Sequence, residues 1–137
     1  MTLKLANQPI RAFTLAIGLV ILNACGLSAE TQALIDEFNR TIPVCEGNLD
    51  CDAKWEAARN WVVSTPSYPI RVSNQDRIET YDADSSRAGT EIRVDREPLG
   101  DDRYRIVVDI DCFGISGCPP FWETKIDFNR VVGSAGQ

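Results

Sequence analysis

The chain has 137 residues and a formal net charge of −6, from 20 acidic and 14 basic side chains. This acidity argues against nucleic acid as a partner, because nucleic-acid-binding proteins carry a basic face. The sequence also contains no histidine, which excludes Ser-His-Asp and Cys-His catalysis. A chain of this length forms one domain with a sizeable core, and we expect that domain over residues 30–137.

The first 24 residues predict an export signal that is removed from the mature chain. Lys4 and Arg11 are the only charged residues before Cys25, and residues 12–24 form an uncharged, mostly apolar run. A basic start, a short apolar run and small residues at its end are typical of a secretory signal. The run is too short for a bilayer-spanning helix, which needs about 20 apolar residues. In an exported protein, cysteines are expected to form disulfides.

The residues before Cys25 indicate how the signal is cut. Leu22-Asn23-Ala24-Cys25 resembles the lipobox of bacterial lipoproteins, although Asn23 stands where that family prefers a small or apolar residue. The resemblance implies cleavage before Cys25, acyl chains on that cysteine, and anchorage in the outer membrane facing the periplasm. Residues 25–29 would then be a short tether, and the acyl chains would make the contact with the membrane. The alternative is an ordinary signal peptide cut near Ala29-Glu30.

Four cysteines are left once Cys25 is set aside. They form two pairs with five residues between the members of each, Cys45 with Cys51 and Cys112 with Cys118. Two local disulfides are the simplest pairing, and the two crossed pairings are the alternatives. In the chain-entropy model, closing a loop of this size stabilises the fold by about 2 kcal/mol. Zinc is disfavoured because these spacings exceed the usual ligand spacing and no histidine is present. We expect no cofactor.

Apolar residues at helical spacing predict two helices in the first half of the domain. The first covers residues 30–39, and its apolar side consists of Ala33, Leu34 and Phe38. The segment between the two helices, which contains Cys45 and Cys51, is expected to break the chain. The second covers residues 52–64, and its apolar side consists of Trp55, Ala58 and Val62, with Trp61 beside them.

Alternating apolar and polar residues predict four strands, at residues 68–73, 76–82, 90–97 and 103–112. The inward positions of the last two strands are apolar and consist of Ile92, Val94, Tyr104, Ile106, Val108 and Ile110. Their opposite face is charged and consists mainly of Glu91, Arg93, Asp95, Glu97, Arg103, Arg105, Asp109 and Asp111. Because a buried parallel strand would be apolar on both faces, this alternation predicts an antiparallel sheet with one solvated face on which opposite charges pair. Residues 98–101 are expected to form the turn between these two strands.

A third helix is expected from Pro119-Pro120 to about Val132, because proline suits a first helical turn. Its apolar stripe consists of Phe121, Thr124, Phe128 and Val131, widened by Trp122 and Ile126. The helices must bury their apolar sides on the dry face of the sheet. The expected fold is therefore a two-layer α+β domain in the order α-α-β-β-β-β-α, with a four-stranded antiparallel sheet and helices on one face.

Several stretches of the domain resemble a family of small uncharacterised bacterial lipoproteins. These stretches are Lys54 to Val62, Arg96 to Gly100, Tyr104 to Val108 and Cys112 to Pro119. The resemblance covers most of the chain between residues 45 and 132. It implies a cell-envelope location and a shared fold, and it implies no particular activity.

Motifs for metal binding and catalysis are weak. Asp82-x-Asp84-x-Ser86 resembles the start of a calcium loop, but Arg87 and Arg93 stand where such a loop needs glycine and glutamate. The carboxylate pairs Asp101/Asp102 and Asp109/Asp111 lie in a turn and on the charged face, and neither predicts a shared low-dielectric pocket for acid–base catalysis. We therefore expect a plain turn, no metal site and no enzyme.

The loop between Cys112 and Cys118 carries Phe113 and Ile115 between glycines. A disulfide-closed loop of this kind could present an apolar interaction tip, since a rigid loop loses little entropy on binding. The interpretation that we favour is that both side chains tuck beneath Trp122 and close the edge of the core.

Two functions fit these expectations. The first is a membrane-anchored binding or structural module of the cell envelope. The second is an acidic periplasmic inhibitor of a basic enzyme, such as a cell-wall lytic enzyme. Removal of residues 1–24 takes away two positive charges and so moves the net charge from −6 to −8, which favours a basic envelope protein as partner.

Overall fold

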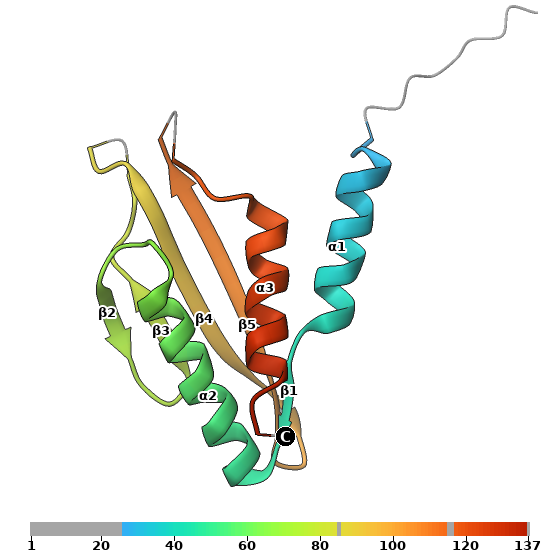
Figure 1. The fold of residues 1–137 in the computed structure, drawn as a ribbon. Helices are drawn as coiled ribbons and strands as arrows, with labels where there is room; N and C mark the ends of the chain where they lie inside the picture. Colours follow the sequence, from blue (N-terminus) through green and yellow to red (C-terminus); the bar gives the residue numbers. More distant parts are fainter. Residues whose placement is uncertain (1–25, 85, 115–116, 137) are drawn as a thin grey trace, which may run out of the picture.

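The computed structural model describes residues 26–136 apart from residues 85, 115 and 116. Three helices and five strands make up the fold (Figure 1). In chain order they are α1 (Ala29–Thr41), β1 (Val44–Glu46), α2 (Gly47–Ser64), β2 (Ile70–Ser73), β3 (Arg77–Thr80), β4 (Gly89–Gly100), β5 (Arg103–Phe113) and α3 (Phe121–Gly133). The expected α+β class and antiparallel sheet are confirmed, but the sheet has five strands rather than four.

β1 is the strand that the sequence did not predict. It pairs with β5 in antiparallel register, with Cys45 opposite Tyr104, and so gives the sheet order β1-β5-β4-β3-β2. Only the central one of its three residues is buried. A segment this short carries too little alternation to be recognised, and its pairing partner lies about 60 residues further along the chain. The predicted order α-α-β-β-β-β-α is therefore wrong at one place, because a strand lies between the first two helices.

Two predicted boundaries differ from the structure by three residues or more. α2 begins at Gly47, so the segment expected to break the chain before residue 52 already forms its first turn. β4 continues to Gly100, so the turn expected at 98–101 is confined to Asp101 and Asp102. Both residues have a φ of 54°, the left-handed conformation that a tight two-residue hairpin requires and that aspartate tolerates.

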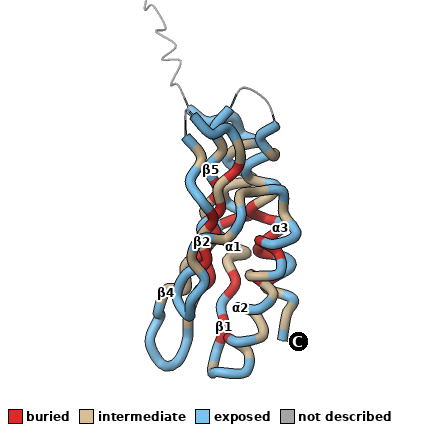
Figure 2. The backbone as a smooth tube through the Cα atoms, turned by 90° about the vertical axis from the view of Figure 1, so that its left-hand side faces the viewer, coloured by how far each residue is buried: buried red, intermediate tan, exposed pale blue. Residues whose placement is uncertain are grey.

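α2 and α3 pack on one face of the sheet, and α1 packs against α3 on the side away from α2 (Figure 1). Figure 2 shows the buried segments in the interior between the layers and the exposed loops at both ends. The inward strand positions Ile92, Val94, Ile106, Val108 and Ile110 are all buried, as the alternation predicts. The predicted apolar side of α2 is also buried and consists of Trp55, Ala58, Trp61 and Val62.

α1 is capped at its start and bonded to α3 at its end. At its start, Ser28 Oγ accepts a hydrogen bond of 3.1 Å from the amide of Thr31, which caps the helix. At its end, the side-chain amide of Asn129 in α3 donates to the carbonyl oxygen of Phe38 (2.9 Å) and to Oγ1 of Thr41 (3.1 Å). The bond to Phe38 reaches one of the last carbonyl groups of α1, which the end of a helix leaves without an internal N–H partner.

The buried face of α3 differs from the predicted stripe. Phe128 and Ile126 are buried as expected, but Phe121 and Val131 are exposed. The remaining buried positions of the helix are Lys125, Asn129 and Val132. Because two of these side chains are polar, a prediction from apolar residues alone missed them and assigned Phe121 and Val131 to the inward face instead.

Lys125 is buried, and its ammonium group is paired with a carboxylate. Its ammonium donates a hydrogen bond of 2.8 Å to Asp109 in β5, and it lies 4.4 Å from the ring centre of Phe121 and 5.4 Å from that of Trp122. This hydrogen bond is the main reason why the pKa of Asp109 lies below its usual value. A lysine stem can cover apolar surface while its charge stays paired, which explains why this position tolerates a cation.

The outer face of the sheet carries the ion pairs that the strand pattern predicts. Arg93 lies opposite Asp109, and Arg77 lies opposite Asp95. Salt bridges of 3.3 Å and 2.7 Å join these pairs, and a further one of 2.5 Å joins Arg105 to Glu97. The predicted solvated, charge-paired face is therefore confirmed. Exposed pairs of this kind each contribute at most about 1 kcal/mol to stability.

Candidate functional site

The two predicted disulfides form, and both are local. The Cα atoms of Cys45 and Cys51 lie 4.9 Å apart, and those of Cys112 and Cys118 lie 5.7 Å apart. The crossed pairings are therefore absent. The predicted lipid-attachment residue, Cys25, lies outside the described residues.

Phe113, the described residue of the possible interaction tip, is exposed. Phe113 keeps 50% of its surface accessible, so our interpretation that it tucks beneath Trp122 is wrong. Trp122 instead contacts Phe38 and Phe121, with ring centres 5.8 Å apart in both pairs. Ile115 lies outside the described residues. A role of this tip in partner binding stays a prediction.

The segment around Asp84 that resembles the start of a calcium loop forms a tight turn, as expected. Asp84 and Arg87 exchange two backbone hydrogen bonds, of 3.1 and 3.0 Å. The carboxylate of Asp84 accepts bonds from the hydroxyl and the amide of Ser86, which lower its pKa. Within residues 26–136, as far as they are described, no group of three His, Cys, Asp or Glu side chains is placed to hold a metal ion.

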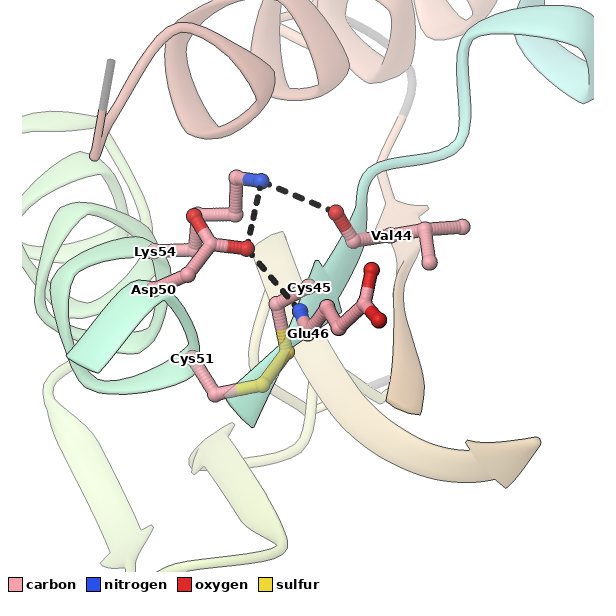
Figure 3. The surroundings of a disulfide bond; sticks show 6 residues. All are labelled: Val44, Cys45, Glu46, Asp50, Cys51 and Lys54. Atoms are coloured by element: carbon pink, nitrogen blue, oxygen red, sulfur yellow. Dashed lines mark hydrogen bonds and ion pairs between the residues drawn. A yellow bond between two sulfur atoms is a disulfide. The ribbon is translucent and has the colours of Figure 1, made fainter. Parts of the chain in front are cut away.

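The Cys45–Cys51 disulfide ties the first turn of α2 to β1 (Figure 3). Asp50 accepts a bond of 2.9 Å from the amide of Glu46 and another of 2.9 Å from the ammonium of Lys54. Lys54 also donates to the carbonyl oxygen of Val44 at 2.9 Å. Both sulfur-bearing residues are fully buried. The disulfide and the polar contacts therefore fix the start of α2 against the edge of the sheet.

The hydrogen bond from Glu46, followed by the bond from Lys54, lowers the pKa of Asp50. A carboxylate whose pKa is lower in the folded than in the unfolded state stabilises the fold above about pH 4 and loses that effect as the pH falls. We expect the free energy of unfolding of the wild type to exceed that of Asp50→Asn at pH 6. We expect this difference to shrink steadily as the pH falls from about 4 to 2. Urea titrations at a series of pH values measure it; a difference that does not change with pH would contradict the assignment.

A polar hollow of about 430 Å³ lies beside this corner, between the start of α2, the β2–β3 turn, the second half of β4 and the start of β5. Its lining residues are Asn48, Asp52, Trp55, Gln75, Asp76, Arg96 and Tyr104. Two of its walls are fixed by the disulfide, because Tyr104 lies opposite Cys45 in the sheet and Asp52 directly follows Cys51. The hollow is therefore built on rigid elements, as a binding site requires.

Arg96 is the unusual member of this lining. Its guanidinium lies 4.2 Å from the ring centre of Tyr104, and its Nε is buried without a hydrogen-bond partner in the described part of the chain. No salt bridge joins it to any carboxylate of the described residues. A buried donor without a partner is costly, which makes Arg96 unusual, but this nitrogen is closed off from solvent and is not itself a contact for a ligand in the hollow.

Of the other side chains that line the hollow, Trp55 is held by a hydrogen bond, and Asp52 and Asp76 are charged. The indole N–H of Trp55 donates to the carbonyl oxygen of Asn74 at 2.9 Å, which fixes the ring between α2 and the β2–β3 turn. Asp52 and Asp76 are exposed and form no salt bridge with a described cation. The lining of this hollow thus contains one guanidinium and two carboxylates.

A second hollow, of about 490 Å³, shares Asp76 and Arg96 with the first and follows the end of β4. Here the amide of Arg96 donates to the carbonyl oxygen of Asp76 at 2.9 Å. The next residue along the same edge, Pro98, has no N–H and cannot pair with an added strand. This edge therefore favours a compact ligand over an extended strand.

Sequence patterns did not reveal this site, although one signal was present. The charged residues of the third predicted strand were assigned to the outer face, at Glu91, Arg93, Asp95 and Glu97. Arg96 has the opposite parity and follows Ile92 and Val94 on the inward face. A charge at an inward position of a strand is the signal that could have found it.

The comparisons with known proteins give no family for this chain: the sequence matches no protein-family model and no curated protein, and no solved structure resembles it significantly. In the described part of the chain, no helix is long and apolar enough to cross a membrane.

Proposed function

We propose that this chain is a lipid-anchored binding module of the bacterial cell envelope. The observation that carries the binding role is the hollow around Arg96, whose guanidinium forms no salt bridge with any carboxylate of the described residues. The support for the anchor is the lipobox-like segment that ends at Cys25. The proposal assigns no catalytic step to the protein.

The arrangement of the elements suits this role. α1 begins at Ala29, only three residues after Gly26, and its first turn lies at the same end of the molecule as the tip of β5 (Figure 1). α2 begins at the opposite end, where the hollow lies. A lipid on Cys25 would therefore hold the domain close to the membrane and leave the hollow facing away from it.

Metabolic labelling with a clickable fatty acid tests the anchor. We expect label on the wild-type protein and none on Cys25→Ser. Asn23→Ala is the matched control, because it changes the same segment toward the residue that lipoproteins prefer there and should keep the label. An unlabelled wild type, or label that persists on Cys25→Ser, would reject the anchor.

An acidic inhibitor of a basic enzyme is the alternative. It draws on the net charge of the chain, but on the outer face of the sheet Asp95, Glu97 and Asp109 are already paired with arginines. These carboxylates would have to leave their partners to bind a basic protein. The hollow around Arg96 needs no such exchange, which is why we place the binding role there.

A further inference from the structure

We propose that the hollow around Arg96 binds a small zwitterionic ligand, the class to which free amino acids and short peptides belong. Arg96 would hold the carboxylate, and Asp52 and Asp76 would hold the ammonium group. This inference deepens the binding half of the proposed function. It does not depend on the lipid anchor, because the hollow is formed by α2, the β2–β3 turn, β4 and β5, at the end of the molecule opposite the first turn of α1.

The carboxylate partner follows from the state of Arg96. The other arginines of the strands β2, β3 and β4, Arg71, Arg77 and Arg93, each form salt bridges with carboxylates of the protein. The guanidinium of Arg96 lies over the ring of Tyr104, 4.2 Å from its centre, and forms no salt bridge among the described residues. A guanidinium without a carboxylate partner can bind the carboxylate of a ligand through two parallel hydrogen bonds.

The ammonium partner follows from the two carboxylates of the same lining. Asp52 comes from α2 and Asp76 from the β2–β3 turn, so two separate elements place negative charge beside the same hollow. A phosphate, with close to two negative charges, would meet repulsion from both. A ligand that carries one negative and one positive group meets opposite charges at both ends, so the lining selects for it.

The size and the walls of the hollow agree with a compact ligand. Its volume of about 430 Å³ lies within the range of small-molecule sites. Tyr104 is half-buried and gives the hollow an aromatic wall, and Asn48 and Gln75 supply amides that can bind a peptide group. Trp55 is buried, and its bond to Asn74 fixes that part of the lining, so little reordering is required there on binding.

Isothermal titration of the purified protein with four probes tests the proposal. The probes are alanyl-alanine, its N-acetyl form, its C-terminal amide and inorganic phosphate. We expect alanyl-alanine to bind at least about tenfold more tightly than either capped form, since each cap removes one charged contact worth about one order of magnitude. Phosphate is expected to bind no more tightly than the capped forms.

Variants of the lining assign the two charged contacts. Arg96→Gln should bind alanyl-alanine no better than the amide, because the group that distinguishes them is gone. Arg96→Lys should recover part of the difference, since it keeps the charge and loses the two-pronged geometry. Asp76→Asn should reduce the preference for the free amino group. Arg103→Gln is the matched control, because Arg103 is an exposed arginine at the start of β5 outside the hollow and its loss should change nothing.

Three results would overturn the proposal: no heat of binding with alanyl-alanine up to millimolar concentration, equal affinity for the free and capped forms, or phosphate as the tightest probe. The last result would identify a simple anion site. Fatty-acid labelling tests only the lipid anchor, and the titration tests only ligand binding. The two proposals can therefore be rejected independently.

Discussion

Replacement of Phe128 by alanine is expected to lower the free energy of unfolding by about 3–5 kcal/mol, the largest effect of any single substitution that we consider here. Phe128 is completely buried and meets the ring of Trp61 edge to face, with ring centres 5.1 Å apart. The same two helices are joined by a bond of 2.9 Å from the Trp61 indole to Asp127. Loss of the ring would leave a cavity where α2, α3 and the sheet meet.

Urea denaturation followed by tryptophan fluorescence measures this effect. Phe113→Ala is the matched control, because the same ring is removed from a half-exposed position at the end of β5. We expect its cost to stay below about 1 kcal/mol. Similar losses for the two variants would mean that Phe128 is not the centre of the core.

Removal of the Cys45–Cys51 disulfide is expected to cost more than removal of Cys112–Cys118. The two bridges have the same sequence separation, so the chain-entropy model assigns each about 2 kcal/mol. Cys45 and Cys51 are fully buried, whereas Cys118 is exposed. A pair of serines at the first site would also bury two hydroxyl groups, so we expect a total loss of about 3–4 kcal/mol there.

Thermal and urea unfolding of the two double variants, Cys45→Ser/Cys51→Ser and Cys112→Ser/Cys118→Ser, compare these losses directly. The first variant should also weaken binding in the hollow around Arg96, because the start of α2 is no longer tied to β1. Equal destabilisation of the two variants would show that loop closure alone accounts for both bridges.

Local patterns predicted most of this fold because its main elements carry their own periodicity. The alternation of Ile106, Val108 and Ile110 identified the inward face of β5, and the spacing of Trp55, Ala58 and Val62 identified that of α2. The equal spacing of the cysteines favoured the two local disulfides that the structure contains. In each case the information lies within about a dozen neighbouring residues.

The features that sequence reasoning missed depend on distant partners. β1 exists because Cys45 and its neighbours pair with β5, and three residues show no pattern of their own. The inward face of α3 includes Lys125 and Asn129, whose burial is explained only by Asp109 in β5 and by the end of α1. Arg96 joins a hollow whose other walls come from α2, the β2–β3 turn and β5, so no linear motif describes it.

The attachment of α1 through its second half has a mechanical consequence. Phe38 and Thr41 fasten this helix to α3, while few of its contacts reach the sheet. A pulling force applied before Gly26 would therefore act along the axis of α1 and separate α1 from α3. It would do so before any strand is separated from the sheet. Once α1 is detached, the force acts on β1, which the Cys45–Cys51 disulfide links to α2. Under such tension α1 would detach from α3 first, and the disulfide-linked start of α2 would keep its structure.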